Sequence, residues 1–373
     1  MKNIFYLGPY KENSGLGRSS RRLIDCLNSS SDINLSIRPV YFSQNTVFDP
    51  SEDSHSVFTE NEENFSPKYD CIIQHGHPEM FEYHQKFGKN IGLVEIETMD
   101  LSHTGWIEKI NLLDEVVVGS LFAAESLYDS GVSIDIKIIP EPYNMEKFHK
   151  EYDNFFFNAA GYENKPFVFY TIGQYSEKKN IKSIIVAFLL EFEKEENVKL
   201  FIKSGDYYIE NMDLEKLITF DIKQIQKSIR KQPENCGTVD VLCGILKEID
   251  IMRLHVSSDC YINSVRGDSF GTCAIEAMLA NNIVINTKNI GSNTYINNRN
   301  GIIAESSISN VYSSHYNTSS SFTIYEKWHD PHIDSLRECM RQAYEMNKED
   351  KASKLNGFDK SIFENKFILE KLI

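Results

Sequence analysis

Two carboxylates, Asp268 and Glu276, give the strongest chemical signal in the sequence. They follow the apolar run 260–263 and enclose Gly271, after which a helical pattern begins. This order predicts a loop above a sheet for Asp268 and a position about a turn and a half into the helix for Glu276. Carboxylates placed there can accept hydrogen bonds from sugar hydroxyls, and Gly271 lets a ligand approach the backbone at the helix start.

Two lysines, Lys178 and Lys179, form a second signal. They lie between an expected strand at 167–172 and an expected helix at 181–192. Cations at the mouth of a parallel sheet can neutralise a diphosphate. The competing interpretation is solvated charge before a helix.

Gly15 and Gly17 form a third signal, between the first expected strand and a helix at 18–27. Glycines at such a turn admit an anion to the helix N-terminus. They do not complete a dinucleotide fingerprint, because Ser20 stands three residues after Gly17 and no acidic residue ends the expected strand at 36–41. A tight turn that caps the helix is the competing interpretation, and a dehydrogenase is the weakest functional alternative.

Short β-branched runs alternate with longer amphipathic stretches along the chain, which is typical of βαβ units and a parallel sheet. The sequence therefore predicts an α/β fold in which this pattern runs twice. The expected strands are 4–7, 36–41, 71–74, 91–95, 115–118 and 136–139, followed by 167–172, 199–202, 238–242, 260–263 and 283–286.

The polar segment 158–166 contains Gly and Pro and separates the two series, as a linker does. We therefore expect domains at 1–160 and 161–330. A tail at 331–373 follows, within a stretch from Trp328 onward that is helical in composition. The Ser/Asn-rich stretch 306–321 reads as an exposed loop.

The 373 residues suffice for two domains, and the net charge is −15. Residues 1–165 hold 14 Lys and Arg against 26 Asp and Glu, so the acidity lies mainly in the first half. Such a balance disfavours a dedicated polyanion binder. The seven scattered cysteines contain no C-x-x-C pair, and neither a signal peptide nor a membrane-spanning run is evident, so we expect reduced thiols and a cytoplasmic protein.

The segment from Arg266 to Met278 resembles the E-x7-E motif of retaining glycosyltransferases of the GT-B fold, family GT4. Further resemblance lies at 14–17, 114–120, 138–144 and 173–180, in the order and spacing of that family. The resemblance implies two Rossmann-like domains that face a central cleft. It also implies a C-terminal helix that crosses back to the first domain.

The resemblance assigns the second domain to a nucleotide diphosphate sugar as donor, with no further cofactor. Glu276 would hold the ribose hydroxyls, Asp268 the transferred sugar, and Lys179 the diphosphate. The backbone N–H groups of Phe270 and Gly271 would bind the leaving phosphate or sugar. Further donor-side residues would be Gly15, Gly17, Gln174, Lys178, Lys203 and Arg266.

The first domain would bind the acceptor: a carbohydrate, a lipid-linked molecule or another hydroxyl compound. His75 is expected to be catalytic, and His77 and Glu97 to face the acceptor. A histidine at a strand end is otherwise more often structural. No Asp-x-Asp pair occurs in the chain, so no metal is expected at the diphosphate.

Two departures from the family pattern bear on activity. Asp268 is one methylene shorter than the usual Glu, and Gln174 replaces the arginine of the diphosphate clamp, for which Lys178 or Arg266 could substitute. We therefore expect a metal-independent, retaining hexosyltransferase and keep a catalytically lapsed sugar-nucleotide-binding protein as the alternative. A nucleic-acid acceptor, or contact with a membrane surface, would need a local basic patch from Arg18, Arg21, Arg22 and Arg38.

Overall fold

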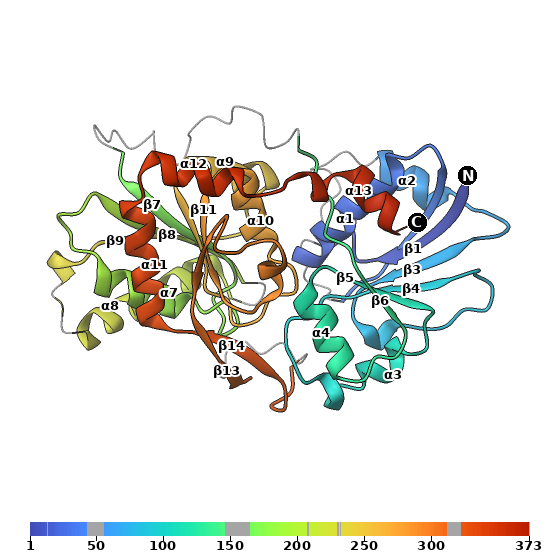
Figure 1. Cartoon of the computed structure of the whole chain (residues 1–373), viewed down its shortest axis with the longest axis horizontal. Helices are drawn as coiled ribbons and strands as arrows, with labels where there is room; N and C mark the ends of the chain where they lie inside the picture. The colour runs from blue at the N-terminus through green and yellow to red at the C-terminus, as the bar shows by residue number, and fades with distance from the viewer. Residues whose placement is uncertain are drawn as a thin grey trace. The chain divides into compact units, whose positions relative to one another are not determined.

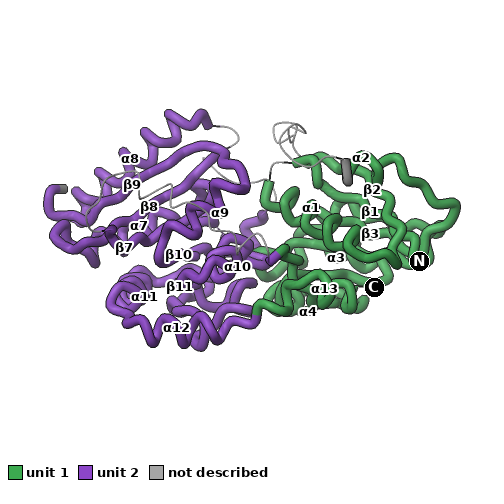
Figure 2. Tube along the Cα trace, turned by 90° about the horizontal axis from the view of Figure 1, so that it is seen from above, with its two compact units in different colours: residues 1–144, 360–373 green, residues 145–359 purple. Residues whose placement is uncertain are grey.

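A computed structural model of the chain describes residues 1–12, 14–42, 56–145, 165–206, 209–229, 231, 233–311 and 322–372. The chain divides into two units (Figure 2). Unit 1 comprises Met1–Asn144 together with Lys360–Ile373, and unit 2 comprises Met145–Asp359.

Unit 1 is built on a six-stranded parallel sheet in the order β2-β1-β3-β4-β5-β6 (Figure 1). Alternate residues of each strand serve opposite faces, so Val117 packs in one core and Val116 and Val118 pack in the other. The strands are β1 (Lys2–Gly8), β2 (Ile33–Pro39), β3 (Cys71–His75), β4 (Asn90–Leu93), β5 (Glu115–Val118) and β6 (Asp135–Ile138).

Helices cover both faces of this sheet, as a parallel sheet requires. One core gathers side chains from the strands, from α1 (Gly15–Asn28) and from α13 (Asn365–Leu372). The other core gathers α3 (Trp106–Ile110) and α4 (Leu121–Asp129). A short helix, α2 (Ser56–Glu63), lies against β2. The end of the chain thus contributes to the first core through Ile368 and Leu372.

Unit 2 holds a second six-stranded parallel sheet, in the order β12-β11-β10-β7-β8-β9. The strands are β7 (Phe167–Ile172), β8 (Val198–Ser204), β9 (Thr238–Cys243), β10 (Cys260–Asn263), β11 (Ile283–Thr287) and β12 (Ile302–Ala304). The helices are α7 (Ile181–Glu191), α8 (Asn211–Ser228), α9 (Glu248–Ser257), α10 (Thr272–Leu279), α11 (Ile333–Glu345) and α12 (Lys348–Asn356).

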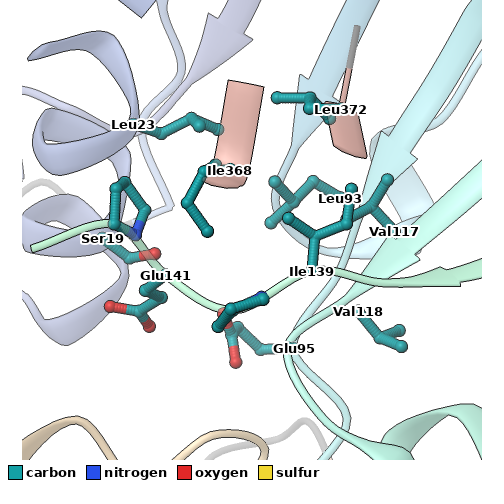
Figure 3. A pocket seen from close by; sticks show the side chains of 13 residues that line it. Ser19, Leu23, Leu93, Glu95, Val117, Val118, Ile139, Glu141, Ile368 and Leu372 are labelled. Atoms are coloured by element: carbon teal, nitrogen blue, oxygen red, sulfur yellow. The ribbon is translucent and has the colours of Figure 1, made fainter. Parts of the chain in front are cut away.

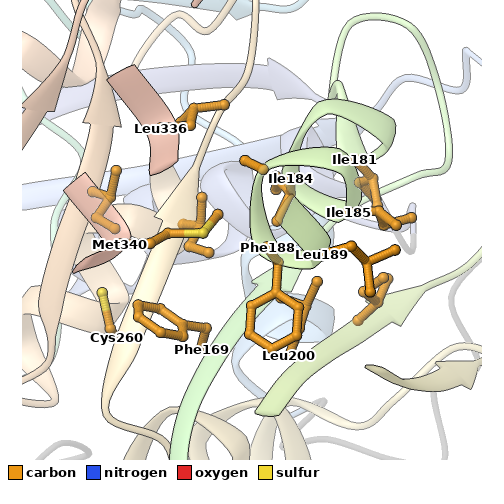
Figure 4. Packing of buried hydrophobic residues seen from close by; sticks show 14 of the residues in the cluster. Phe169, Ile181, Ile184, Ile185, Phe188, Leu189, Leu200, Cys260, Leu336 and Met340 are labelled. Atoms are coloured by element: carbon orange, nitrogen blue, oxygen red, sulfur yellow. The ribbon is translucent and has the colours of Figure 1, made fainter. Parts of the chain in front are cut away.

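The main core of unit 2 lies between one face of its sheet and the helices α7, α8 and α11. Figure 4 shows side chains of α7 and of α11, among them Phe188 and Met340, near Phe169, Leu200 and Cys260 of the strands. Ring contacts of His255 with Tyr170 and Tyr261 place α9 against the opposite face.

The eleven expected strands are all observed, within a few residues at their ends, and the α/β fold with two parallel sheets is confirmed. The stretch 306–321 was expected to be a loop, but residues Ser306–Asn310 form β13, which pairs antiparallel with β14 (Lys327–Pro331). Trp328 therefore lies in a strand rather than in a helical segment. Cross-strand pairing of polar residues explains why composition alone missed this hairpin.

The expected tail divides between the two units. Only Lys360–Ile373 joins unit 1, where α13 packs on α1. Residues 331–359 lie in unit 2 instead, because Leu336, Cys339, Met340 and Ala343 of α11 complete the core against α7. The expected domain boundary near residue 160 lies outside the described residues.

Candidate functional site

The strand order of unit 2 reverses between β7 and β10, and ligands of open α/β sheets bind at such a switch point beyond the carboxyl ends of the strands. The loops that follow these two strands are joined to each other. Asn180 donates its amide to the Ser264 carbonyl at 3.1 Å, and the Arg266 N–H donates to the Lys178 carbonyl at 2.8 Å. The structure therefore brings the lysine segment and the carboxylate segment together.

Gly271 stands at the N-terminus of α10 with a φ of 87°, a left-handed conformation that favours glycine. A Cβ atom at this position would lie 2.5 Å from the Cβ of Ser292. No other residue type therefore fits there without displacement of the backbone. Phe270 beside it is buried, with its ring against Tyr295 at 5.3 Å between centroids.

Asp268 and Glu276 are both buried, at 8% and 3% exposure. Asp268 lies beside Gly271, since a Cβ on that glycine would be 3.0 Å from Asp268 Oδ2. Glu276 lies in α10, and its Oε2 is 3.5 Å from His255 Nε2 of α9. A burial of this depth costs an ionised carboxylate free energy unless polar partners surround it, which is typical of a binding site rather than of a solvated surface.

The loop after β7 carries the candidate diphosphate ligands. The Lys179 side chain lies along Gly173, because a Cβ on that glycine would be 3.3 Å from Lys179 Cγ. Lys203 of β8 is in register with the last residue of β7, so it comes from the neighbouring strand at the same edge of the sheet. Gln174 donates its amide to Asp206 Oδ2 at 2.8 Å.

Asp206 was not among the residues singled out from the sequence. Its signal was a carboxylate two residues after an apolar strand, at the same edge as Gln174. Gln174, which stands where the family pattern has an arginine, is thus paired with a carboxylate. Neither Gln174 nor Asp206 adds positive charge to the site.

The Arg266 side chain is held by contacts within unit 2. It is buried, donates through Nε to Asp330 Oδ1 at 2.7 Å and through Nη1 to Glu177 Oε2 at 3.1 Å, and lies over the Trp328 ring. Two carboxylates thus balance its charge, so the expectation that Arg266 replaces the missing clamp arginine finds no support in this geometry. The ammonium of Lys178 lies 5.5 Å from the centroid of the Phe322 ring.

The glycine loop of unit 1 is filled by its own peptide. A Cβ on Gly17 would lie 2.0 Å from the Glu12 carbonyl oxygen, and Ser14 caps α1 by accepting from the Gly17 N–H at 3.0 Å. Arg21 also donates to the Glu12 carbonyl at 2.9 Å. These contacts support the interpretation of this segment as a tight turn that caps α1. Gly15 is the first residue of that helix, and Gly17 lies in its first turn.

His75 lies at the end of β3, fully buried, where its Nδ1 is 2.6 Å from the Tyr6 hydroxyl. Burial lowers the pKa of His75 to about 3. Its imidazole is therefore neutral at physiological pH and has no contact with solvent, which argues against its expected catalytic role. His77 is half-buried, with its ring edge on Phe42 at 4.9 Å, and Glu97 is half-buried beyond β4.

Three of the four arginines weighed as a basic patch make contacts within the protein. Arg22 donates to Glu141 at 2.6 Å and stacks on Tyr143, Arg38 donates to backbone carbonyls, and Arg21 donates to the carbonyls of Tyr10 and Glu12. Each of these three guanidinium groups is engaged by the protein, which weakens the case for a polyanion at this place.

Unit 1 also has a small pocket of about 30 Å³ at the carboxyl ends of β4, β5 and β6. Figure 3 shows Leu23 of α1, Ile368 and Leu372 of α13, and the carboxylates of Glu95 and Glu141 around it. Mainly apolar side chains line the pocket, two of them from α13. The pocket is therefore explained by the packing of α13 against the sheet and does not by itself indicate a ligand site.

Among the residues that the structure describes, no group of His, Cys, Asp and Glu side chains is arranged to hold a metal ion. Within the same residues, no helix is both long enough and apolar enough to cross a bilayer. None of the seven cysteines forms a disulfide.

Comparisons with known proteins agree with this architecture. Residues 153–312 match the family model described as Glycosyl transferases group 1. HepE of Anabaena, solved with UDP and glucose, has 13% identity and a TM-score of 0.63, with 100% of this chain and 98% of that chain covered. Sucrose-phosphate synthase of Thermosynechococcus elongatus has 13% identity and a TM-score of 0.64, with 99% and 97% covered.

A third similar structure is the UDP-forming α,α-trehalose-phosphate synthase of Burkholderia xenovorans, at 10% identity and a TM-score of 0.65, with 100% and 98% covered. A comparison with curated protein sequences gave no match. Residues 153–312 thus match a glycosyl transferase family model, and the structural comparisons show that the chain has the GT-B fold.

Proposed function

We propose that this protein is a retaining glycosyltransferase of family GT4 that transfers a hexose from a nucleoside diphosphate sugar to an acceptor hydroxyl without a metal. The observation that carries the proposal is the placement of Asp268, Gly271 and Glu276 at the start of α10, beside the switch point of β7 and β10. This placement lies within the segment that matches the glycosyltransferase model.

In the donor site, Glu276 accepts hydrogen bonds from the ribose and Asp268 from the transferred sugar. The N–H groups of Phe270 and Gly271 bind the leaving group, and Lys179, with Lys203 and Lys178, neutralises the diphosphate. The chemical demand is to stabilise a departing diphosphate and an electron-poor sugar. Preorganised cations and a helix N-terminus aimed at the phosphates meet the first part of that demand.

Unit 1 would bind the acceptor, a carbohydrate or a lipid-linked or other hydroxyl compound, in the cytoplasm or at a membrane surface. His77 and Glu97 are its candidate contacts, and Gly15 and Gly17 shape the loop at the switch point between β1 and β3. We leave His75 out of the reacting groups because it is fully buried behind Tyr6.

The test is a turnover assay with a panel of nucleotide sugars, in which release of the nucleoside diphosphate and transfer to simple sugar acceptors are both measured. We expect one donor to be consumed and its anomeric configuration to be kept in the product, with activity undiminished by a chelator. Inversion at the anomeric carbon or loss of activity with chelator would contradict the corresponding part of the proposal.

A second candidate function is a sugar-nucleotide-binding protein without transfer activity. The hydrogen bond between Gln174 and Asp206 favours it, because this pair stands where a clamp arginine would add positive charge. A donor that raises the melting temperature but is neither hydrolysed nor transferred would support this candidate over the enzyme.

A further inference from the structure

A buried polar network lies behind Glu276. Tyr170 of β7 and His255 of α9 are fully buried, and Asn282, which follows α10, is 4% exposed. The Tyr170 hydroxyl is 2.6 Å from His255 Nδ1, and Asn282 Nδ2 is 2.9 Å from the same hydroxyl and 2.6 Å from the His255 carbonyl oxygen. Tyr170 and Asn282, from two other segments of unit 2, therefore both contact His255 of α9.

The amide nitrogen of Asn282 only donates, so the Tyr170 oxygen accepts from it. We infer that the Tyr170 hydroxyl proton points to His255 Nδ1, because a buried hydroxyl donates where an acceptor lies within reach, here at 2.6 Å. Burial raises the pKa of Tyr170 well above its ordinary value, so the phenol keeps that proton.

A neutral imidazole whose Nδ1 accepts a hydrogen bond carries its proton on Nε2. That nitrogen lies 3.5 Å from Oε2 of Glu276. This separation is longer than an ordinary hydrogen bond, and His255 Nε2 makes none in this structure. Such contacts often shorten when the ligand is bound. The network thus directs an N–H group toward the carboxylate that the proposed function assigns to the ribose.

We propose that His255 is a positioning residue for Glu276: Tyr170 and Asn282 set its tautomer, and its Nε2–H holds the Glu276 carboxylate in the orientation that accepts the ribose hydroxyls. The inference rests on the proposed function, because it takes the ribose as the ligand of Glu276. A histidine that only filled the core would satisfy the same burial without any effect on recognition of the ribose.

Unit 1 supplies a matched control. Tyr6 of β1 and His75 are also fully buried, and their oxygen and Nδ1 are also 2.6 Å apart. Nε2 makes no hydrogen bond in either histidine, but Nε2 of His255 lies 3.5 Å from Oε2 of Glu276. Tyr6→Phe therefore removes a comparable tyrosine–histidine hydrogen bond far from Glu276 in the sequence and in the other unit.

The experiment measures ribose recognition by calorimetry. UDP, ADP, GDP and CDP are titrated into the chain of 373 residues, and the tightest binder is compared with its 2′-deoxy counterpart. We expect the wild type to prefer the ribonucleotide about tenfold, the value of one hydrogen bond to a charged group. His255→Leu should reduce this ratio to about twofold or less, and Tyr170→Phe should reduce it in part.

His255→Gln can place an amide N–H near the position of Nε2, so it should restore most of the ratio. Tyr6→Phe should lower the melting temperature as Tyr170→Phe does and leave the ratio unchanged. An unchanged ratio in folded His255→Leu, or in Tyr170→Phe if the leucine variant does not fold, overturns the positioning role. A wild type that binds none of the four nucleotides overturns the donor site itself, and the inference falls with it.

Discussion

Each unit holds a tyrosine on its first strand whose hydroxyl lies 2.6 Å from a buried histidine nitrogen, yet the two histidines have different surroundings. The second nitrogen makes no hydrogen bond in either histidine, but that of His255 in unit 2 lies 3.5 Å from Oε2 of Glu276. The glycine loops differ similarly, because Gly17 packs on a carbonyl of its own loop and Gly271 begins a helix beside the Asp268 carboxylate. The same scaffold therefore supports packing in one unit and, in our proposal, ligand recognition in the other.

Removal of the carboxylate that distinguishes unit 2 should have the largest effect. Glu276→Ala is expected to lower transfer activity about a hundredfold to a thousandfold while the protein stays folded, because the donor loses a charged hydrogen-bond acceptor in a buried site. Turnover with the preferred nucleotide sugar measures it. Glu305→Ala, an exposed carboxylate paired with Lys288 in the same unit, is the control, and near wild-type turnover of Glu276→Ala would sink the donor site.

Arg266 should matter for folding rather than for charge at the donor. Arg266→Leu leaves Glu177 and Asp330 without their shared partner, so we expect the free energy of unfolding to fall by about 3 kcal/mol. Chemical denaturation measures this loss. Arg253→Leu, which breaks a more exposed pair with Asp250, should cost about 1 kcal/mol or less, and equal costs for the two variants would contradict the structural assignment.

Lys179 should contribute through its charge at the diphosphate. Lys179→Ala is expected to reduce kcat/KM for the donor about tenfold to fiftyfold. The affinity for a neutral nucleoside, which has no phosphates, should fall less. Steady-state kinetics and nucleoside binding separate the two effects. Lys182 is an exposed lysine in the first turn of α7 that pairs with Asp221 of α8, and Lys182→Ala should behave as the wild type does. An equal loss for nucleoside and nucleoside diphosphate would argue against a phosphate contact.

The missing clamp arginine offers a gain of function. Gln174→Arg is expected to tighten binding of the nucleoside diphosphate about tenfold and to make it more sensitive to salt, because a full charge joins Lys179 beside the phosphates. Calorimetry at two ionic strengths tests this. Gln85→Arg adds the same charge to an exposed position of unit 1 and should change neither value. Unchanged binding by Gln174→Arg would show that Asp206 neutralises the added charge.

The buried histidine of unit 1 should produce the smallest effect, on stability. The pKa of His75 is about 3 in the folded protein and about 6.5 in an unfolded chain, so acid protonates the unfolded state first. The free energy of unfolding should then fall by about 1 kcal/mol from pH 6.5 to 5.5 through this residue and level off above about pH 7.5.

Denaturation at several pH values measures that slope. His75→Gln should lose this part of the slope, and the more exposed His84→Gln should keep it. A transfer rate that still depends on the side chain of His75 after correction for folding would restore its catalytic role.

Much of the fold could be predicted because parallel strands that are buried on both faces consist of apolar runs. Each such run can be recognised without knowledge of its neighbours, as at Phe167–Ile172 and Cys260–Asn263. The hairpin of β13 and β14 was not predicted, because β13 is polar and its strand structure depends on antiparallel pairing with β14, which the local sequence does not reveal. The division of the tail escaped as well, since helical periodicity gives the buried face of α11 but not the sheet on which that face packs.

The sequence by itself determined the positions of the two carboxylates, of the glycine between them and of the lysines after β7, and the succession of strands along the chain. Spacing and hydrophobic period are local properties, so they can be read without the tertiary structure. Only the tertiary structure decided that Arg266 is held by Glu177 and Asp330, and that His255 stands behind Glu276. These contacts join segments far apart in the chain, and the partners of a buried polar group are set by which strands and helices pack together.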